Sequence, residues 1–245
     1  MEKQRNSSME EIKKNPRILC LHGFRTSAEI LKKLILQWPE SILKKLDLVF
    51  LDGPYPAQGK SAVEGIFDPP YYEWFQADKD YREFYNFEEC VEFIEDYMIK
   101  HGPFDGVLGF SQGAVLAATF PGMQREGVAL TKVPELKFLI IISGAVFGEG
   151  ILLGCPKLAA NAFSSPIIYF YCLSFYFKRN LRFYFLLLVI LKFVAYDFEY
   201  IEETGVMKEQ NEAILRRFID PVVIRHSEGH TIPRLGMSLF ALIER

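Results

Sequence analysis

The sequence predicts an α/β fold in which a mostly parallel β-sheet is covered by helices on both faces. Short runs that are apolar throughout alternate along the chain with segments that have the apolar spacing of amphipathic helices. Continuous apolar strands are typical of parallel sheets buried on both faces. With 245 residues, of which 50% are hydrophobic, the chain is long enough for one sizeable core.

The expected strands are short apolar runs that end in a glycine, a proline or a polar turn. They are "RILCLHG" (17–23), "LDLVFLDGP" (46–54), "FDGVLGF" (104–110), "KFLIIISGA" (137–145) and "PVVIRH" (221–226). The expected helices are 27–38, 86–102, 112–120, 207–219 and 233–245. The helix at 86–102 has Asn86 as its expected N-cap and Gly102 as its stop. In such sheets the chemistry lies at the carboxyl ends of the strands.

Residues 1–15 are interpreted as a polar tail and residues 16–245 as a single domain. The formal charge of -3, from 28 basic and 31 acidic residues, gives no reason to expect binding to nucleic acid or to acidic lipid. The start of the chain lacks the uninterrupted apolar stretch of a signal peptide, so a cytoplasmic location is expected, with the nucleus as a second one. Composition leaves the oligomeric state open.

The cysteines predict neither a disulfide framework nor a metal site. Cys20, Cys90, Cys155 and Cys172 lie far apart and form no CxxC pair, which favours reduced and mostly buried thiols. No other ligand spacing suggests a metal, and no cofactor is expected.

Ser111 is the candidate nucleophile. It lies in "LGFSQGA", with Gly109 two residues before it and Gly113 two residues after it, between an expected strand and an expected helix. This is the GxSxG pattern of a nucleophile elbow, in which a Cβ at either glycine would collide with the neighbouring strand or helix. The pattern also arises by chance, and the plainer alternative is a turn serine that caps the following helix.

A serine hydroxyl needs a base, and His230 is the best placed of the four histidines. It lies in "SEGHTIPRL", a loop after the last expected strand. In an α/β-hydrolase the nucleophile comes first along the chain and the histidine comes last of the catalytic residues. His101 ends a helix, His226 lies within a strand, and His22 ends the first strand, where its backbone is of more use than its side chain. Acyl transfer also needs an oxyanion hole, for which we expect the backbone amides of Phe24 and Gln112.

Several stretches together match one family. They are "LCLHGFRTSAEIL", "FLDGPYPAQGK", "GIFDPPYYEWF", "FDGVLGFSQGA" and "DPVVIRHSEGHTIPRL". Over roughly residues 16–165 and 197–240 the chain resembles the FSH-type family of small serine hydrolases. The resemblance implies an α/β-hydrolase fold, a Ser-Asp-His triad and hydrolysis of a small-molecule carboxylic ester, with Ser111 as nucleophile and His230 as base. The aromatic residues of "IFDPPYYEWF" could line an acyl pocket or lid, or could form a proline turn with packed aromatics.

The acid of the triad is where the chain departs from the family. The family's acid lies in a strand-end motif similar to "IGETD", and the matching stretch here, "YIEETGVMK", places Gly205 at that position. Glu202 and Glu203 lie near the expected strand end and are the candidate substitutes, because glutamate can serve as the acid. Asp220 is expected at the wrong end of the next strand. Both glutamates could equally be solvated loop carboxylates.

An atypical apolar insertion at about 168–196 is the second departure. Its most apolar uncharged run, 183–191, is much shorter than the ~20 residues that span a bilayer, so no membrane span is expected. Its Phe, Tyr, Leu, Ile, Lys and Asn content suggests that 173–195 is translated intron sequence; an interfacial or gating helix is the alternative.

Two functions remain at this stage. The first is a carboxylic ester hydrolase, or the related thioesterase, that works through an acyl-serine intermediate with activity reduced by the missing acid. The second is a non-catalytic protein of the same fold that binds a small ester or lactone. Ser111, His230 and the "HGF" stretch favour the first function, whereas Gly205 favours the second.

Overall fold

The computed structural model describes residues 14–78, 84–144 and 230–234. Four parallel strands form its central sheet in the order β2-β1-β7-β8. These are β1 (Arg17–Leu21), β2 (Asp47–Leu51), β7 (Gly106–Phe110) and β8 (Phe138–Ile142). The four strands expected from the sequence in this part of the chain are therefore confirmed. The helix expected at 207–219 and the strand expected at 221–226 lie outside the described residues. Of the helix expected at 233–245 only residues 233 and 234 are described, and these two are not helical. The single domain over 16–245 stays a prediction.

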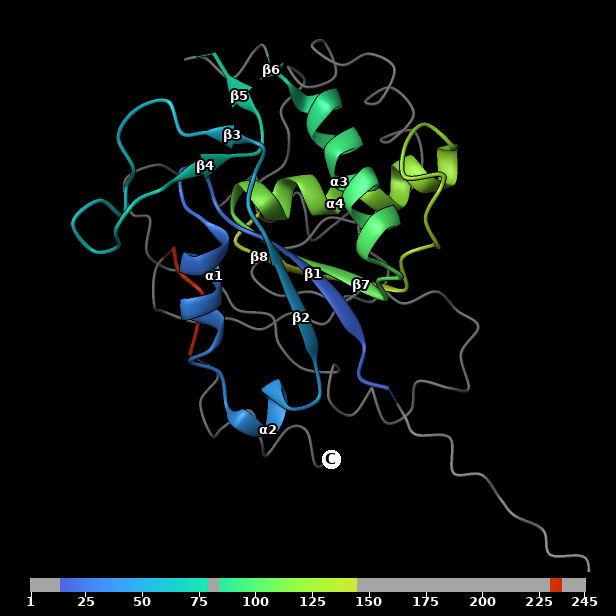
Figure 1. The fold of residues 1–245 in the computed structure, drawn as a ribbon, viewed down its shortest axis with the longest axis horizontal. Coiled ribbons are helices and arrows are strands. Elements are labelled where there is room, and N and C mark those ends of the chain that lie inside the picture. Colours follow the sequence, from blue (N-terminus) through green and yellow to red (C-terminus); the bar gives the residue numbers. More distant parts are fainter. Residues whose placement is uncertain (1–13, 79–83, 145–229, 235–245) are drawn as a thin grey trace, which may run out of the picture.

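Helices cover both faces of the sheet, as predicted (Figure 1). Successive residues of one strand point to opposite faces, so Leu19 and Leu21 pack with α3 (Phe87–His101) and α4 (Gln112–Glu126). Ile18 and Cys20 pack on the other face with α1 (Ala28–Ile35) and the short α2 (Glu40–Leu43). This burial on both faces explains why the strands are apolar throughout.

Three helix ends differ from the sequence-based expectations. The first is the end of α1, which ends at Ile35 rather than at the expected residue 38. Asn86 precedes α3 but does not cap it with its side chain, because the Asn86 backbone is left-handed and its Nδ2 donates to Gln76 Oε1 at 2.6 Å. Helix α4 passes through Pro121 and ends at Glu126, six residues later than expected. Gly127, with φ 69°, then takes the left-handed conformation that ends many helices.

Four short strands fill the segment between β2 and α3. β3 (Tyr55–Pro56) pairs with β4 (Tyr72–Glu73), and β5 (Gln76–Ala77) pairs with β6 (Phe84–Tyr85), both antiparallel. Figure 1 shows them gathered at the carboxyl ends of β1 and β2. The sequence analysis missed these strands, because two-residue strands give no periodicity.

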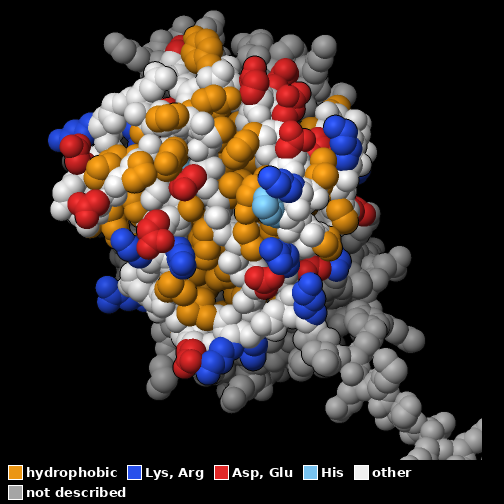
Figure 2. Space-filling view, in the orientation of Figure 1, with side chains coloured by type: hydrophobic (Ala, Val, Ile, Leu, Met, Phe, Trp, Pro, Cys, Tyr) orange, Lys and Arg blue, Asp and Glu red, His pale blue; other side chains and the backbone are white. Residues whose placement is uncertain are grey.

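The described surface carries mixed charge. Figure 2 shows acidic and basic side chains interspersed with hydrophobic ones on the viewed face. Within 14–78, 84–144 and 230–234, no helix is long and apolar enough to cross a membrane. Cys20 and Cys90 are free and buried, as expected, and burial raises the pKa of both thiols.

Candidate active site

Ser111 stands at the turn between β7 and α4, as predicted. Its backbone has φ 53° and ψ -114°, a conformation that side-chain-bearing residues rarely adopt. The Ser111 amide donates to the carbonyl oxygen of Ile142 at 2.9 Å, which ties the turn to the neighbouring strand β8. The strain is held by the surrounding hydrogen bonds and packing, and strained residues of this kind cluster at functional sites.

The two glycines of the elbow are there because the backbone leaves no room for a side chain. A Cβ at Gly109 would collide with the backbone of Gly113 and Ala114 in the first turn of α4. A Cβ at Gly113 would collide with the carbonyl oxygens of Leu21 and His22 at the end of β1. The predicted collision with strand and helix is therefore confirmed. The serine side chain makes no cap hydrogen bond to α4.

His230 lies next to Ser111 although the two residues are far apart in the sequence. Its Nε2 is 3.0 Å from Ser111 Oγ. The segment that carries His230 is anchored to the core, because Ile232 is buried and the Trp38 indole donates to the Pro233 carbonyl at 3.1 Å. The structure thus brings together the two residues that the sequence predicted as nucleophile and base.

The surroundings of His230 favour the neutral ring. The imidazole packs against Phe110, with ring centroids 5.3 Å apart. Although part of the residue remains exposed, desolvation of the ring lowers its pKa below the ordinary value of 6.5. Desolvation therefore favours the neutral form of the imidazole at pH 7. The Ser111 hydroxyl can donate to Nε2 when the other nitrogen, Nδ1, carries the ring proton.

The loop after β1 approaches Ser111 closely. A Cβ placed on Gly23 would lie 3.3 Å from Ser111 Cβ and 3.1 Å from the Phe110 ring, which leaves little space for a side chain. Within the described ranges, neither the Phe24 amide nor the Gln112 amide donates to a backbone carbonyl. Gln112 is the first residue of α4, where helix geometry leaves the amide without an intrahelical partner. The oxyanion role of both amides stays a prediction.

The side chain of His22 has a larger role than the sequence suggested. It is fully buried, its Nε2 accepts from the Gly53 amide at 2.9 Å, and its Nδ1 lies 2.8 Å from the Gly23 carbonyl oxygen. Because a backbone amide only donates, Nε2 is unprotonated and Nδ1 carries the proton. Burial lowers the pKa of His22 to about 4, so the ring stays neutral at pH 7. The imidazole thus joins the ends of β1 and β2.

Trp74 connects the aromatic segment to the same place. Its indole nitrogen donates to the His22 carbonyl at 2.8 Å, and its ring is fully buried. The Gln112 side chain accepts from the Trp74 amide at 3.1 Å and donates to the Phe75 carbonyl at 2.8 Å. The sequence left open whether the aromatic residues of "IFDPPYYEWF" line an acyl pocket or lid or pack in a proline turn. Trp74 and Phe75 are buried and packed. Sequence reasoning missed these links, because the residues involved form no motif.

Several predicted features lie outside the described residues. Glu202, Glu203 and Gly205 are among them, as is the insertion at about 168–196. The identity of the acid and the nature of the insertion therefore stay predictions. Among the residues that are described, no group of three or more His, Cys, Asp or Glu side chains could hold a metal ion.

The sequence matches the model of one protein family, described as serine hydrolase (FSH1), over residues 9–186. The match covers more than half of the chain and includes the elbow at Ser111. The chain belongs to this family. The resemblance inferred from the sequence is thereby confirmed: the chain is a member of a serine hydrolase family. The matched range ends before His230.

Curated relatives include proteins named esterases. "Esterase CG5412" of Drosophila melanogaster is 26% identical over 233 residues, which is 91% of this chain and 70% of that protein. "Esterase OVCA2" of Bos taurus is 32% identical over 145 residues, 52% of this chain and 63% of that protein. "Esterase FUS5" of Gibberella fujikuroi is 35% identical over 117 residues, 45% of this chain and half of that protein.

A solved structure supports the fold. SOBER1 of Arabidopsis thaliana matches with a TM-score of 0.50 at 15% sequence identity, over 95% of this chain and 99% of that chain. Together with the family match, the parallel sheet and the strained elbow, this similarity confirms the prediction of an α/β-hydrolase fold.

Proposed function

We propose that this chain hydrolyses small-molecule carboxylic esters, thioesters included, through an acyl intermediate on Ser111. The observation that carries the proposal is the 3.0 Å contact between Ser111 Oγ and His230 Nε2 at the carboxyl end of a parallel sheet. The family match and the relatives named esterases support the same reaction.

The first half of the reaction forms the acyl-enzyme. His230 Nε2 takes the Ser111 proton as Oγ bonds to the substrate carbonyl carbon, and the carbonyl oxygen becomes an oxyanion. The amides of Phe24 and Gln112 donate to that oxygen. His230 then gives its proton to the leaving alcohol or thiol as the bond to the acyl carbon breaks.

The second half repeats these steps with water. His230 removes a proton from a water molecule, the resulting hydroxide attacks the acyl carbon, and the Ser111 Oγ leaves with the proton that His230 returns. Serine and histidine are thereby regenerated, and the acid product departs.

The rate of this cycle depends on an acidic residue that orients His230. Gly205 occupies the position of the family's acid, so we expect slow turnover. If nothing else orients His230, kcat should be about 10⁴-fold lower than with the acid in place. If one of Glu202 and Glu203 serves as the acid, its replacement by glutamine will lower activity, whereas replacement of the other glutamate will not. Comparison of kcat for Glu202→Gln and Glu203→Gln with the native chain assigns the role.

The missing acid also favours a second candidate, a non-catalytic protein that binds a small ester or lactone. Labelling with a fluorophosphonate probe, together with hydrolysis of p-nitrophenyl esters, separates the two functions. The native chain should be labelled and should turn over, and Ser111→Ala should abolish both. Ser41→Ala is the matched control, because Ser41 is an exposed serine of α2. Folded native protein without Ser111-dependent labelling would refute the enzyme and leave the binding function.

A further inference from the structure

The loop that follows β1 is held in an uncommon conformation. We name residues 22–26 the oxyanion loop, because it contains Phe24, whose amide is the proposed oxyanion donor. Arg25, the next residue, has φ 50°, in the left-handed region where a residue with a side chain is strained. Such a conformation persists only where the surrounding structure over-determines it. The contacts that hold Arg25 therefore also fix the direction of the neighbouring Phe24 amide.

A buried carboxylate provides the main contact. Arg25 Nε donates to Glu73 Oε1 at 2.7 Å, and the Glu73 side chain is only 1% exposed. The same carboxylate accepts from the Gln58 amide at 3.1 Å and from Gln76 Nε2 at 3.1 Å. With these partners, the charge of Glu73 is compensated in a place where an unpaired carboxylate would be costly.

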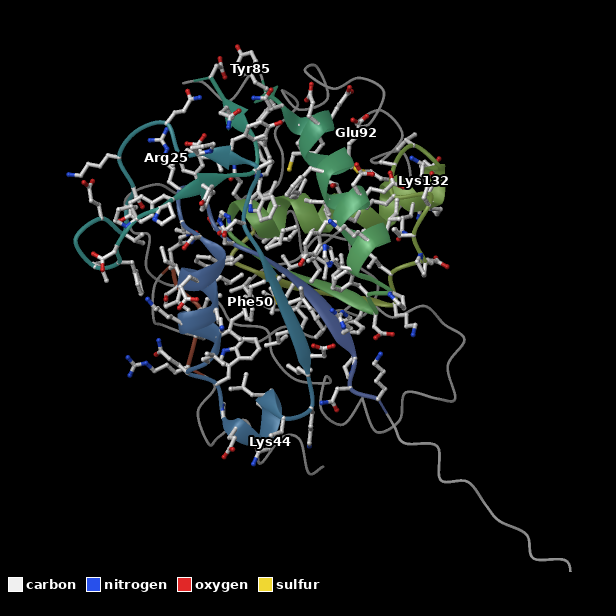
Figure 3. All side chains as sticks on the ribbon, in the orientation of Figure 1. Arg25, Lys44, Phe50, Tyr85, Glu92 and Lys132 are labelled. Atoms are coloured by element: carbon white, nitrogen blue, oxygen red, sulfur yellow. The ribbon has the colours of Figure 1, made fainter. Side chains whose placement is uncertain are left out.

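Further hydrogen bonds join the oxyanion loop to the segment between β2 and α3, which also contains Glu73. The Ser61 hydroxyl donates to the Arg25 carbonyl at 2.6 Å, and the Tyr72 amide donates to the Thr26 carbonyl at 2.7 Å. Figure 3 places Arg25 beside β3 and β4, the strands of this segment. The guanidinium also lies 4.6 Å from the centre of the Phe24 ring. The Arg25 side chain thus contacts both the buried Glu73 carboxylate and Phe24, the residue with the proposed oxyanion donor.

We propose that the Arg25–Glu73 ion pair is a positioning device that keeps the Phe24 amide directed at the oxyanion formed over Ser111. The inference rests on the proposed function, since it assigns a catalytic consequence to the pair. Neither side chain is needed to touch the reacting atoms. Loss of the pair releases the strain at Arg25, and a donor displaced by about 1 Å can cost about 100-fold in rate.

The test compares kcat and KM for p-nitrophenyl butyrate among the native chain, Arg25→Met, Glu73→Gln and the double variant. Arg25→Met keeps the apolar stem and removes the guanidinium, whereas Glu73→Gln keeps the shape and removes the charge. Arg17→Met is the matched control, because Arg17 pairs with Asp47 at 3.3 Å at the amino end of β1, far from the elbow. The fraction of each sample labelled by a fluorophosphonate normalises kcat to competent sites.

The expected result is a 10- to 100-fold lower kcat per labelled site in both single variants, with KM within about twofold. The double variant should be no slower than the slower single one, because both changes remove the same contact. Arg17→Met should stay within twofold of the native chain. If Arg25→Met does not fold, Glu73→Gln and Arg25→Lys decide the question by the same readouts.

Two results would overturn the inference. Variants that lose thermal stability and labelled fraction but keep the native kcat per labelled site would show a purely structural pair. Fully additive losses in the double variant would show that the two side chains act separately. An active native chain with either result refutes only the positioning role, whereas a native chain without Ser111-dependent hydrolysis refutes the proposed function and this inference with it.

Discussion

Replacement of His22 by glutamine should change how the stability of the protein depends on pH. The native ring is fully buried, and burial lowers its pKa to about 4 from the ordinary 6.5. An unfolded chain therefore takes up a proton at this residue near pH 6.5, whereas the folded chain takes it up only near pH 4. Between these values the unfolded state binds more protons, so acidification favours unfolding.

The size of the effect follows from the two pKa values. At roughly 1.36 kcal/mol per pH unit, the gap between 6.5 and about 4 corresponds to about 3 kcal/mol of lost stability once the pH is below both values. Well above pH 6.5 the contribution of this ionisation falls to zero. At pH 7 the variant should be less stable by about 1–3 kcal/mol, because it loses the Nδ1 hydrogen bond to Gly23 and part of the ring packing.

Urea unfolding of both proteins between pH 7.5 and 4 provides the measurement. Glutamine does not titrate, so the variant should lose less stability on acidification, and the difference between the two proteins should shrink by up to about 3 kcal/mol at pH 4. The other histidines and the carboxylates are common to both proteins and cancel in the difference. A difference that stays constant across this range would show that His22 has an ordinary pKa in the folded state and would refute the burial argument.

Three further predictions concern the site. Gly113→Ala places a Cβ against carbonyl oxygens at the end of β1. It should lower the free energy of unfolding by at least about 1–3 kcal/mol and kcat at least tenfold. A near-native kcat would show that the elbow has room for this Cβ. Trp38→Phe removes the hydrogen bond to Pro233, so the free energy of unfolding in urea should fall by about 1 kcal/mol and kcat should fall at unchanged KM. An unchanged kcat would show that this hydrogen bond does not position His230. Because His230 acts as a base only when neutral and its pKa is lowered, kcat/KM should rise with pH to a plateau with its midpoint below 6.5, and a midpoint above 6.5 would exclude a desolvated ring.

Much of the described architecture was predictable from local patterns. The four strands of the sheet are apolar because both of their faces are buried, so each is visible as a continuous hydrophobic run. Ser111 was found for a similar local reason, since the glycines that the elbow needs are within two residues of it. The short strands β3–β6 and the end of α4 were not predictable, because they depend on packing and on a left-handed Gly127 rather than on periodicity.

The sequence by itself determined the sheet, the elbow and the order in which nucleophile and base occur. Only the tertiary structure decided that His230 lies 3.0 Å from Ser111, because this contact joins residues 119 positions apart through the anchored segment at Ile232 and Pro233. It also decided the roles of the "HGFR" and "YEWF" stretches. Hydrogen bonds and an ion pair between these stretches form only when the segment after β2 folds back over the end of β1, and no local pattern records such a contact.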